Sequence, residues 1–271
     1  MRVVRLGQGV DATGRFADEA IERTLAACDE YAVLCKEFGV EKLRFAATSA
    51  TRDASNRDAF IDGVVARLGV APEVISGNEE ATLSFVGATR ELRGIEPAPY
   101  LVVDIGGGST EFVLGDATPV AARSVDIGCV RMTERHGFAA TEADLVAAIA
   151  DIDQAILLAA SEVPVQEAAT FVAVAGSATT VAAHALQLPE YSRDAIHRTR
   201  LTRAQVAQAS EDFLRMTAAE RRALPYMHPG RVDVIPAGAL ILRRIMDVCD
   251  FEHVLISEHD ILDGIAWSIP G

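Results

Sequence analysis

The first third of the chain alternates amphipathic helical patterns with short apolar runs. Between residues 15 and 38, apolar residues recur at intervals of three and four, a spacing that predicts a helix with one buried face. The same reasoning predicts two further helices, at 53–68 and 78–92, and two short buried strands, at 43–47 and 73–76. The segment 93–99 is rich in glycine and proline, so we expect it to be a linker.

The pattern begins again with a strand after this linker. A mostly apolar run occupies 100–105, and the runs 111–114 and 119–125 follow after short turns, which predicts antiparallel neighbours. Further helices are expected at 140–162, 202–216, 236–247 and 260–268, and one more should end near residue 185. Two further strands are expected at 171–175 and 254–257. This order predicts an α/β protein with two domains, at 1–95 and 96–257.

Length, composition and charge narrow the possible functions. The 271 residues suffice for two domains of ordinary size. No apolar run approaches the roughly 20 residues of a membrane span, and we find no signal peptide. The four cysteines show neither metal-ligand spacing nor a disulfide framework, so we expect reduced thiols and a cytoplasmic location. The six histidines also lack metal-ligand spacing and are interpreted as structural or surface residues. The net charge of −14 disfavours DNA and membrane surfaces as partners.

The strongest chemical signal follows the strand expected at 100–105. Three glycines, two hydroxyl residues and an acid stand there in succession, namely Gly106, Gly107, Gly108, Ser109, Thr110 and Glu111. Glycines let backbone N–H groups approach an anion closely, and the two hydroxyls add donors. Asp104 and Glu111 place carboxylates on either side of the loop, which suits a hard cation such as Mg²⁺ beside a phosphate. A tight glycine hairpin without a ligand is the alternative.

A second loop of small residues has similar chemistry. The strand expected at 171–175 leads into Gly176, Ser177 and Thr179, where a helix is expected to begin. The N-terminus of a helix offers unpaired N–H donors and the positive end of the dipole. Simple capping by Ser177 or Thr179 explains the same residues equally well when the loop is taken alone. Two such loops in one domain favour a ligand with several phosphates.

Two segments of the first domain carry charged candidates. Glu79 and Glu80 lie in the first turn of the helix expected at 78–92. A carboxylate there is either a base for phosphoryl transfer or a favourable partner of the helix dipole. Arg52 follows the strand expected at 43–47, and it either steadies phosphate charge or is an ordinary surface arginine.

A family resemblance rests on seven segments in a fixed order, ATSATRDASN, VISGNEEA, VVDIGGGSTEFVLG, DIGCVRMTE, AGSATT, MHPGRVDVIPAGALIL and SEHDILDGIA. Together they resemble the exopolyphosphatase and guanosine pentaphosphate phosphohydrolase family over nearly the whole chain. The resemblance implies a two-domain actin-like (ribonuclease H-like) ATPase fold with the active site between the domains, and a C-terminal helix, 258–271, packed back on the first domain. It also implies a Mg²⁺-dependent hydrolase that releases terminal phosphate from polyphosphate or guanosine pentaphosphate.

The family's functional residues map onto this chain motif by motif. The resemblance implies that Glu80 is the catalytic carboxylate that activates water, and that Arg52 is the arginine of the first domain's motif. Asp104 and Glu111 match the metal-associated acids. Phosphate binding is implied for residues of both loops, namely Gly106, Gly107, Gly108, Ser109, Gly176, Ser177 and Thr179. Gly128 is expected near the cleft, and Arg131 is a weaker candidate there.

One part of the family's pattern is missing from this chain. The family opens with a strand and an Asp-x-Gly-Ser/Thr-Asn-Ser/Thr loop, whereas Met1 falls where the following hairpin would end. We therefore expect a first domain without its opening strands. A start codon assigned too late is favoured over a genuine loss of the segment.

Several functions remain open at this stage. A hydrolase is favoured over a non-catalytic binder of polyphosphate or an alarmone, a role that the missing phosphate segment would explain. A kinase of the same fold is a third class, but the sequence offers no feature for a nucleoside pocket or an acceptor site. The motifs do not decide between polyphosphate and guanosine pentaphosphate, and they are compatible with a homodimer.

Overall fold

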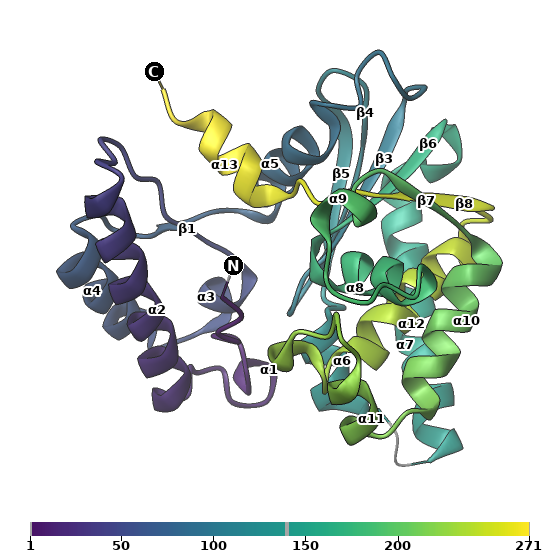
Figure 1. Cartoon of the computed structure of the whole chain (residues 1–271), viewed down its shortest axis with the longest axis horizontal. Helices are drawn as coiled ribbons and strands as arrows, with labels where there is room; N and C mark the ends of the chain where they lie inside the picture. Colours follow the sequence, from purple (N-terminus) through teal and green to yellow (C-terminus); the bar gives the residue numbers. More distant parts are fainter. Residues whose placement is uncertain (1, 139–140, 271) are drawn as a thin grey trace.

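The computed structural model describes residues 2–138 and 141–270, which form two lobes of unequal size (Figure 1). The smaller lobe contains β1 (Ala46–Ala47) and β2 (Glu73–Val74), paired in parallel, and the helices α1 (Val10–Thr13), α2 (Asp18–Glu37), α3 (Ser49–Asp53) and α4 (Arg57–Leu68). Its core is small and centres on Phe60, which packs edge-on against Phe16 at 5.8 Å between ring centroids.

The larger lobe is built on a mixed six-stranded sheet with the order β5-β4-β3-β6-β8-β7. Its strands are β3 (Tyr100–Ile105), β4 (Thr110–Gly115), β5 (Pro119–Val125), β6 (Thr170–Val174), β7 (Thr199–Thr202) and β8 (His253–Ile256). Strands β3, β6 and β8 run parallel, β4 is antiparallel to both β3 and β5, and β7 is antiparallel to β8. Every residue of β3 and β6 is buried, as their mostly apolar sequences predict.

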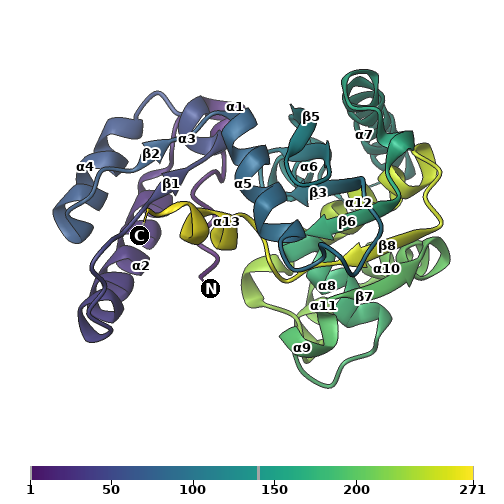
Figure 2. The same cartoon turned by 90° about the horizontal axis from the view of Figure 1, so that it is seen from above.

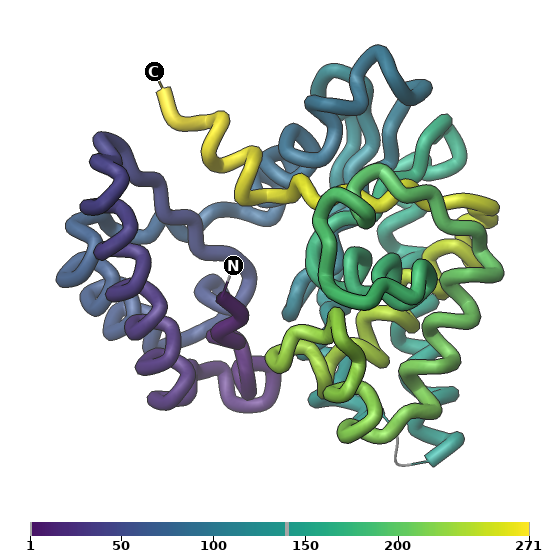
Figure 3. The backbone as a smooth tube through the Cα atoms, in the orientation of Figure 1, coloured from purple at the N-terminus to yellow at the C-terminus, as the bar shows by residue number. Residues whose placement is uncertain are grey.

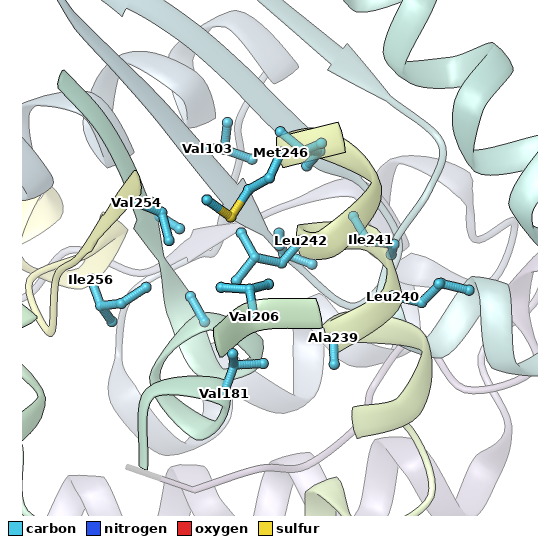
Figure 4. Close-up of a cluster of buried hydrophobic side chains, with 14 of the residues drawn as sticks. Val103, Val181, Val206, Ala239, Leu240, Ile241, Leu242, Met246, Val254 and Ile256 are labelled. Atoms are coloured by element: carbon cyan, nitrogen blue, oxygen red, sulfur yellow. The ribbon is translucent and has the colours of Figure 1, made fainter. Parts of the chain in front are cut away.

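Helices cover both faces of this sheet. The remaining described helices are α5 (Gly77–Thr89), α6 (Cys129–His136), α7 (Glu142–Glu162), α8 (Ala175–Ala185), α9 (Arg193–Ile196), α10 (Arg203–Arg215), α11 (Ala218–Ala223), α12 (Ile235–Val248) and α13 (Ile261–Ser268). Figure 4 shows the main core, in which Val103 and Val254 of the sheet meet Val206 of α10 and Leu242 and Met246 of α12. Full burial of such side chains contributes about 1.5–3 kcal/mol each.

The opposite face of the sheet packs on α5. Because side chains alternate across a strand, Tyr100 and Val102 of β3 point to this face, where they join a cluster with Phe85 and Leu92. Asp104 is the next residue of the same series. The strand pattern therefore places an acid beneath α5, at the end of an otherwise apolar stripe.

Helices α5 and α13 pack against each other between the lobes (Figures 1 and 2). Two glycines allow their backbones to touch. A Cβ atom on Gly87 would lie 1.9 Å from the carbonyl oxygen of Asp260, and one on Gly264 would lie 1.9 Å from that of Leu83. Arg44 of the smaller lobe also donates to Ser268 over 2.6 Å, so α13 contacts both lobes. The domain boundary after residue 95 stays a prediction.

The N-terminal segment lies between the lobes. Figure 3 shows it beside the segment that precedes α12. Arg5 donates from Nη2 to the carbonyl of Gly230 over 2.7 Å, and its guanidinium lies 3.5 Å from the carboxylate of Asp233. These contacts hold residues of the smaller lobe against the larger one.

The α/β class expected from the pattern is confirmed. The strands β3 and β5 have the expected bounds, and the long helices α2, α7, α10 and α12 begin and end within three residues of expectation. Residue 140, the expected start of one helix, lies outside the described residues.

Two local expectations were wrong. The runs 43–47 and 73–76 contain strands of only two residues. The helix expected at 53–68 is interrupted between α3 and α4, because Asn56 turns its side chain to Phe16, accepting from its amide over 2.8 Å and donating to its carbonyl over 3.1 Å.

Candidate active site

Two carboxylates lie opposite each other on β3 and β4. Asp104 and Glu111 are cross-strand partners, and both side chains are buried. Ser84 of α5 donates to Asp104 over 2.6 Å, and Ser124 of β5 donates to Glu111 over 2.7 Å. Desolvation raises the pKa of Asp104 to about 7 and raises the pKa of Glu111 well above its ordinary value. Neighbouring buried carboxylates of this kind favour the sharing of a proton or a cation.

Glu80 is a third carboxylate of the same group. It lies in the first turn of α5 and is 8% exposed. Arg52 donates from Nη1 to Glu80 over 2.9 Å and to the carbonyl of Ile75 over 2.8 Å, so one guanidinium orients the carboxylate. Burial raises the pKa of Glu80, and Arg52 opposes this rise. The charge of Glu80 in turn raises the pKa of Glu111, which places these acids within electrostatic reach of one another.

The N-terminus of α6 holds the glycine loop, residues 106–109. The amides of Cys129 and Val130 donate to two carbonyls of the loop, each over 2.9 Å. Among the described residues, nothing accepts a hydrogen bond from the amides of Gly107 and Gly108. A loop whose carbonyls are occupied and whose amides are available is suited to an anion.

Arg131 and Gly128 fix the shape of the glycine loop. Arg131 donates from Nε to the carbonyl of Gly108 over 2.7 Å. A Cβ atom on Gly128 would lie only 2.3 Å from the carbonyl oxygen of Gly107, so position 128 requires glycine. From the smaller lobe, Ser49 approaches so closely that its Oγ would lie 2.8 Å from a Cβ on Gly108. The loop therefore lies between the two lobes.

The second loop lies at the start of α8. Ala175 has a φ of +66°, a left-handed conformation that residues with a side chain rarely adopt and that often marks functional sites. No side chain caps the helix, so its first amides are available as donors. Arg231 lies against Gly176, where a Cβ would stand 2.2 Å from the guanidinium, and donates to Thr180 over 3.1 Å. Backbone donors and a cation thus meet at this helix end.

Three adjoining cavities connect the two loops. The first, of about 360 Å³, is lined by Glu80 and by the glycine loop. The second, of about 280 Å³, lies between the glycine loop and Gly176, with Ser177 in its wall. The third, of about 670 Å³, continues from Gly176 past Thr179 and Tyr191 towards α13. Neighbouring cavities share lining residues, so the three lie in series from one loop to the other.

Ion pairs hold the lobes together beside the first cavity. Arg131 pairs with Asp11 of α1, and with Asp53 of α3 over 2.9 Å. Arg135 pairs with Asp11 over 2.9 Å, and this hydrogen bond lowers the pKa of Asp11. Because Arg131 also holds the glycine loop, the contact between the lobes is linked to the shape of this loop, which is predicted to bind phosphate.

The structure brings most of the residues singled out from the sequence to one place. Thr110 is the exception. It is fully buried, and its hydroxyl donates to the carbonyl of Ile127, so it does not line the cavity. Thr110 and Glu111 are adjacent on β4 and point to opposite faces, a consequence of strand alternation that the sequence already contains.

Two residues near the site were not assigned from the sequence. Asp260 accepts from the amide of Leu262 over 2.8 Å at the start of α13, and its charge raises the pKa of Asp104. Burial raises the pKa of Asp260 itself. The other residue is Arg231, which belongs to the segment MHPGRVDV, so its motif was a usable signal.

The acids suit a hard divalent cation. Asp104 and Glu111 offer only oxygen donors, the ligand type that Mg²⁺ prefers. Both are buried, and mutual repulsion adds to desolvation in raising the pKa of Glu111. A cation held between them would compensate this charge, so the residues present fit the metal that the motif resemblance implies.

The comparison with known families decides what kind of protein carries this site. The model of the Ppx/GppA phosphatase family matches residues 1–269. The chain belongs to the Ppx/GppA phosphatase family. Exopolyphosphatase 2 of Mycobacterium tuberculosis is 47% identical over 281 residues, covering 100% of this chain and 88% of the relative.

Further Ppx/GppA-type relatives agree with the fold. The crystal structure of an exopolyphosphatase-like protein is 44% identical and superposes with a TM-score of 0.95, covering 98% of this chain and 89% of that one. A guanosine-5'-triphosphate,3'-diphosphate pyrophosphatase of Vibrio atlanticus is 28% identical over 274 residues, covering 99% of this chain and 53% of the relative. The actin-like fold expected from the motifs is confirmed. None of the described helices of this Ppx/GppA chain is long and apolar enough to cross a membrane.

Proposed function

We propose that this Ppx/GppA protein is a phosphohydrolase that releases the terminal phosphate of polyphosphate, of guanosine pentaphosphate, or of both, with Mg²⁺ as cofactor. The position of Glu80 carries the proposal. It is a buried carboxylate with a raised pKa, it is oriented by Arg52, and it lines the same cavity as the glycine loop. The names of the relatives from Mycobacterium tuberculosis and Vibrio atlanticus support these two substrates.

The residues divide the chemistry between them. Glu80 accepts a proton from the water that attacks the terminal phosphorus, and its raised pKa strengthens it as a base. The bond from that phosphorus to the bridging oxygen breaks, and the shortened phosphate chain leaves as an anion. Arg52 is a positioning residue that fixes the carboxylate. A Mg²⁺ ion held by Asp104 and Glu111 would offset the negative charge of the phosphates.

The two loops bind different parts of the substrate. The amides of Gly107 and Gly108 donate to the oxygens of the terminal phosphate, close to Glu80. The start of α8, with Arg231, receives phosphates further along the chain. The adjoining cavities between the loops support this arrangement.

The experiment compares phosphate release by the wild type, Glu80→Gln and Glu79→Gln, from polyphosphate and from guanosine pentaphosphate with Mg²⁺. Glu79 is the matched control, since it is next in sequence but bonds Arg44 outside the cavity. We expect Glu80→Gln to lower kcat by about 100-fold or more, the usual contribution of a general base, and Glu79→Gln to keep near wild-type activity.

Two results would overturn the proposal. Full activity of Glu80→Gln would remove the assigned base. A wild-type chain that binds polyphosphate or guanosine pentaphosphate but releases no phosphate would instead identify a non-catalytic binder.

A further inference from the structure

A second group of potential metal ligands lies outside the cleft. It consists of Glu91, which follows α5, His197, which follows α9, and His259, which precedes α13. One ligand atom from each residue lies within 4.8 Å of the others. The three residues come from distant parts of the sequence, so only the fold brings them together.

The distances in this group fit coordination better than hydrogen bonding. His197 Nε2 and His259 Nδ1 each lie 3.5 Å from the same oxygen, Oε2 of Glu91. This separation is long for a hydrogen bond. Two ligands of a tetrahedral zinc ion, with metal bonds of about 2.0–2.1 Å, stand roughly 3.4 Å apart. Each nitrogen therefore lies at the distance from the Glu91 oxygen that separates two ligands of one ion, and all three atoms lie within 4.8 Å of one another.

The two nitrogens also lack other partners. His197 Nε2 and His259 Nδ1 are buried, and neither makes a hydrogen bond within the described residues. Buried polar atoms are normally satisfied, so a pair of them aimed at one carboxylate calls for an explanation. The rings are held in place by packing. They stack on each other at 4.7 Å between centroids, and the ring of Trp267 meets His259 edge-on at 6.2 Å.

We propose that Glu91, His197 and His259 bind one transition-metal ion of the Zn²⁺ class, with water completing the coordination. Two imidazoles and a carboxylate are a ligand set that selects zinc and its neighbours over Mg²⁺. The site is separate from the oxygen-only acids of the cleft.

Metal binding changes the protonation of one ring. The amide of Glu258 donates to His197 Nδ1 over 3.2 Å, so the neutral ring carries its proton on Nε2 in the metal-free protein. Coordination through Nε2 moves this proton to Nδ1, and the Glu258 amide loses its acceptor. The carboxylate of Glu258 receives hydrogen bonds from Tyr191 and Arg193, which line the third cavity. Through Glu258, binding of the metal is thereby linked to Tyr191 and Arg193 in the wall of that cavity.

The site also joins the end of α5 to the start of α13. Glu91 stands just beyond α5, and His259 stands directly before Asp260, whose carbonyl touches Gly87. An ion that joins Glu91 to His259 therefore fastens the end of α5 to the start of α13. We infer that it stabilises the contact through which α13 is held between the lobes.

The test is a Zn²⁺ titration of the full chain by calorimetry, in excess Mg²⁺ to saturate the acids of the cleft. We expect one Zn²⁺ per wild-type chain. Glu91→Gln should weaken binding at least 10-fold, and the double variant His197→Ala/His259→Ala should abolish it. Glu22→Gln and His253→Ala, at exposed positions outside the group, are the matched controls and should bind as the wild type does.

A Co²⁺ titration provides a second readout that does not need the double histidine variant. Tetrahedral coordination gives intense visible absorption bands, which we expect in the wild type and in His253→Ala, whereas in Glu91→Gln they should require at least 10-fold more Co²⁺. The Glu91 side chain is 53% exposed, so its replacement by Gln leaves the fold intact. Absence of Zn²⁺ binding by the wild type, or wild-type affinity in both Glu91→Gln and the double histidine variant, would overturn the proposal.

Discussion

Asp104 and Glu111 face each other directly across β3 and β4, and each is held by a serine from a neighbouring element. The charge of Asp104 raises the pKa of Glu111, so in the absence of a cation the two ionised side chains repel each other. The repulsion thus destabilises the folded protein when no metal is bound. The same carboxylate oxygens are already positioned to bind a cation. Four predictions follow from this pair and from the loop beside it.

Asp104→Asn should stabilise the metal-free protein and remove its response to Mg²⁺. The amide keeps the size of the side chain but removes one buried charge. At pH 8 in chelator, we expect the free energy of unfolding to rise by about 1–3 kcal/mol, measured by urea unfolding. Added Mg²⁺ should stabilise the wild type and the exposed-site control Asp116→Asn, but not this variant. An equal Mg²⁺ response in all three would contradict the assignment of the acid pair as the metal site.

Stability of the metal-free protein should fall as the pH rises from about 4 to about 7. Burial raises the pKa of Asp104 from 3.8 to about 7, so the unfolded chain loses this proton first and is favoured increasingly through that window. The raised pKa values of Glu80 and Glu111 act in the same direction. Urea unfolding at pH 5 and pH 8 in chelator measures the fall, which should be smaller in Asp104→Asn. A fall of the same size in that variant would rule out Asp104 as a source.

Arg131→Gln should lower kcat/KM by about 10- to 100-fold. Arg131 holds the carbonyl of Gly108 and pairs with Asp11 and Asp53, so its loss releases both the glycine loop and the contact between the lobes. A hydrogen bond to a charged group contributes about 1.5–3 kcal/mol, which corresponds to that range. Steady-state phosphate release is the measurement. Arg215→Gln, on the surface of α10, is the control, and equal kinetics of the two variants would refute the role of Arg131.

Gly128→Ala should reduce phosphate release at least 10-fold while leaving the protein folded. Its Cβ would stand 2.3 Å from the carbonyl oxygen of Gly107, so the glycine loop must shift. The control is Gly39→Ala, at a φ of +61° with no atom within 4 Å of the new Cβ. This control should lose about 1 kcal/mol of stability but keep its activity. Circular dichroism measures folding and phosphate release measures activity, so together they distinguish an unfolded variant from a folded but inactive one. An active Gly128→Ala variant would show that the loop tolerates the change.

The elements that bear the acids could be predicted because their patterns are local. The strand at 100–105 is an apolar run whose one acid, Asp104, lies next to its end, and Glu111 follows a glycine turn near the start of the next strand. The misassignment of Thr110 arose from attention to its hydroxyl rather than to strand alternation, which turns it away from Glu111.

Other features depend on contacts that sequence distance conceals. The break between α3 and α4 exists because Asn56 binds the backbone of Phe16, a partner that the helical pattern of 53–68 does not contain. The histidines at 197 and 259 show no metal-ligand spacing, yet the fold places both beside Glu91. Asp260 joins the acids of the cleft only because α13 returns to α5.

Strand β8 comes last among the described strands but lies inside the sheet, between β6 and β7. In the described part of the chain β7 pairs with β8 alone, so it has no partner until residues 253–256 have left the ribosome. Until then the growing chain exposes the unpaired, apolar edge of β6, and pairing over such sequence distances is slow. Shielding of that edge during synthesis, by a chaperone or by transient local structure, is therefore a requirement of this strand order.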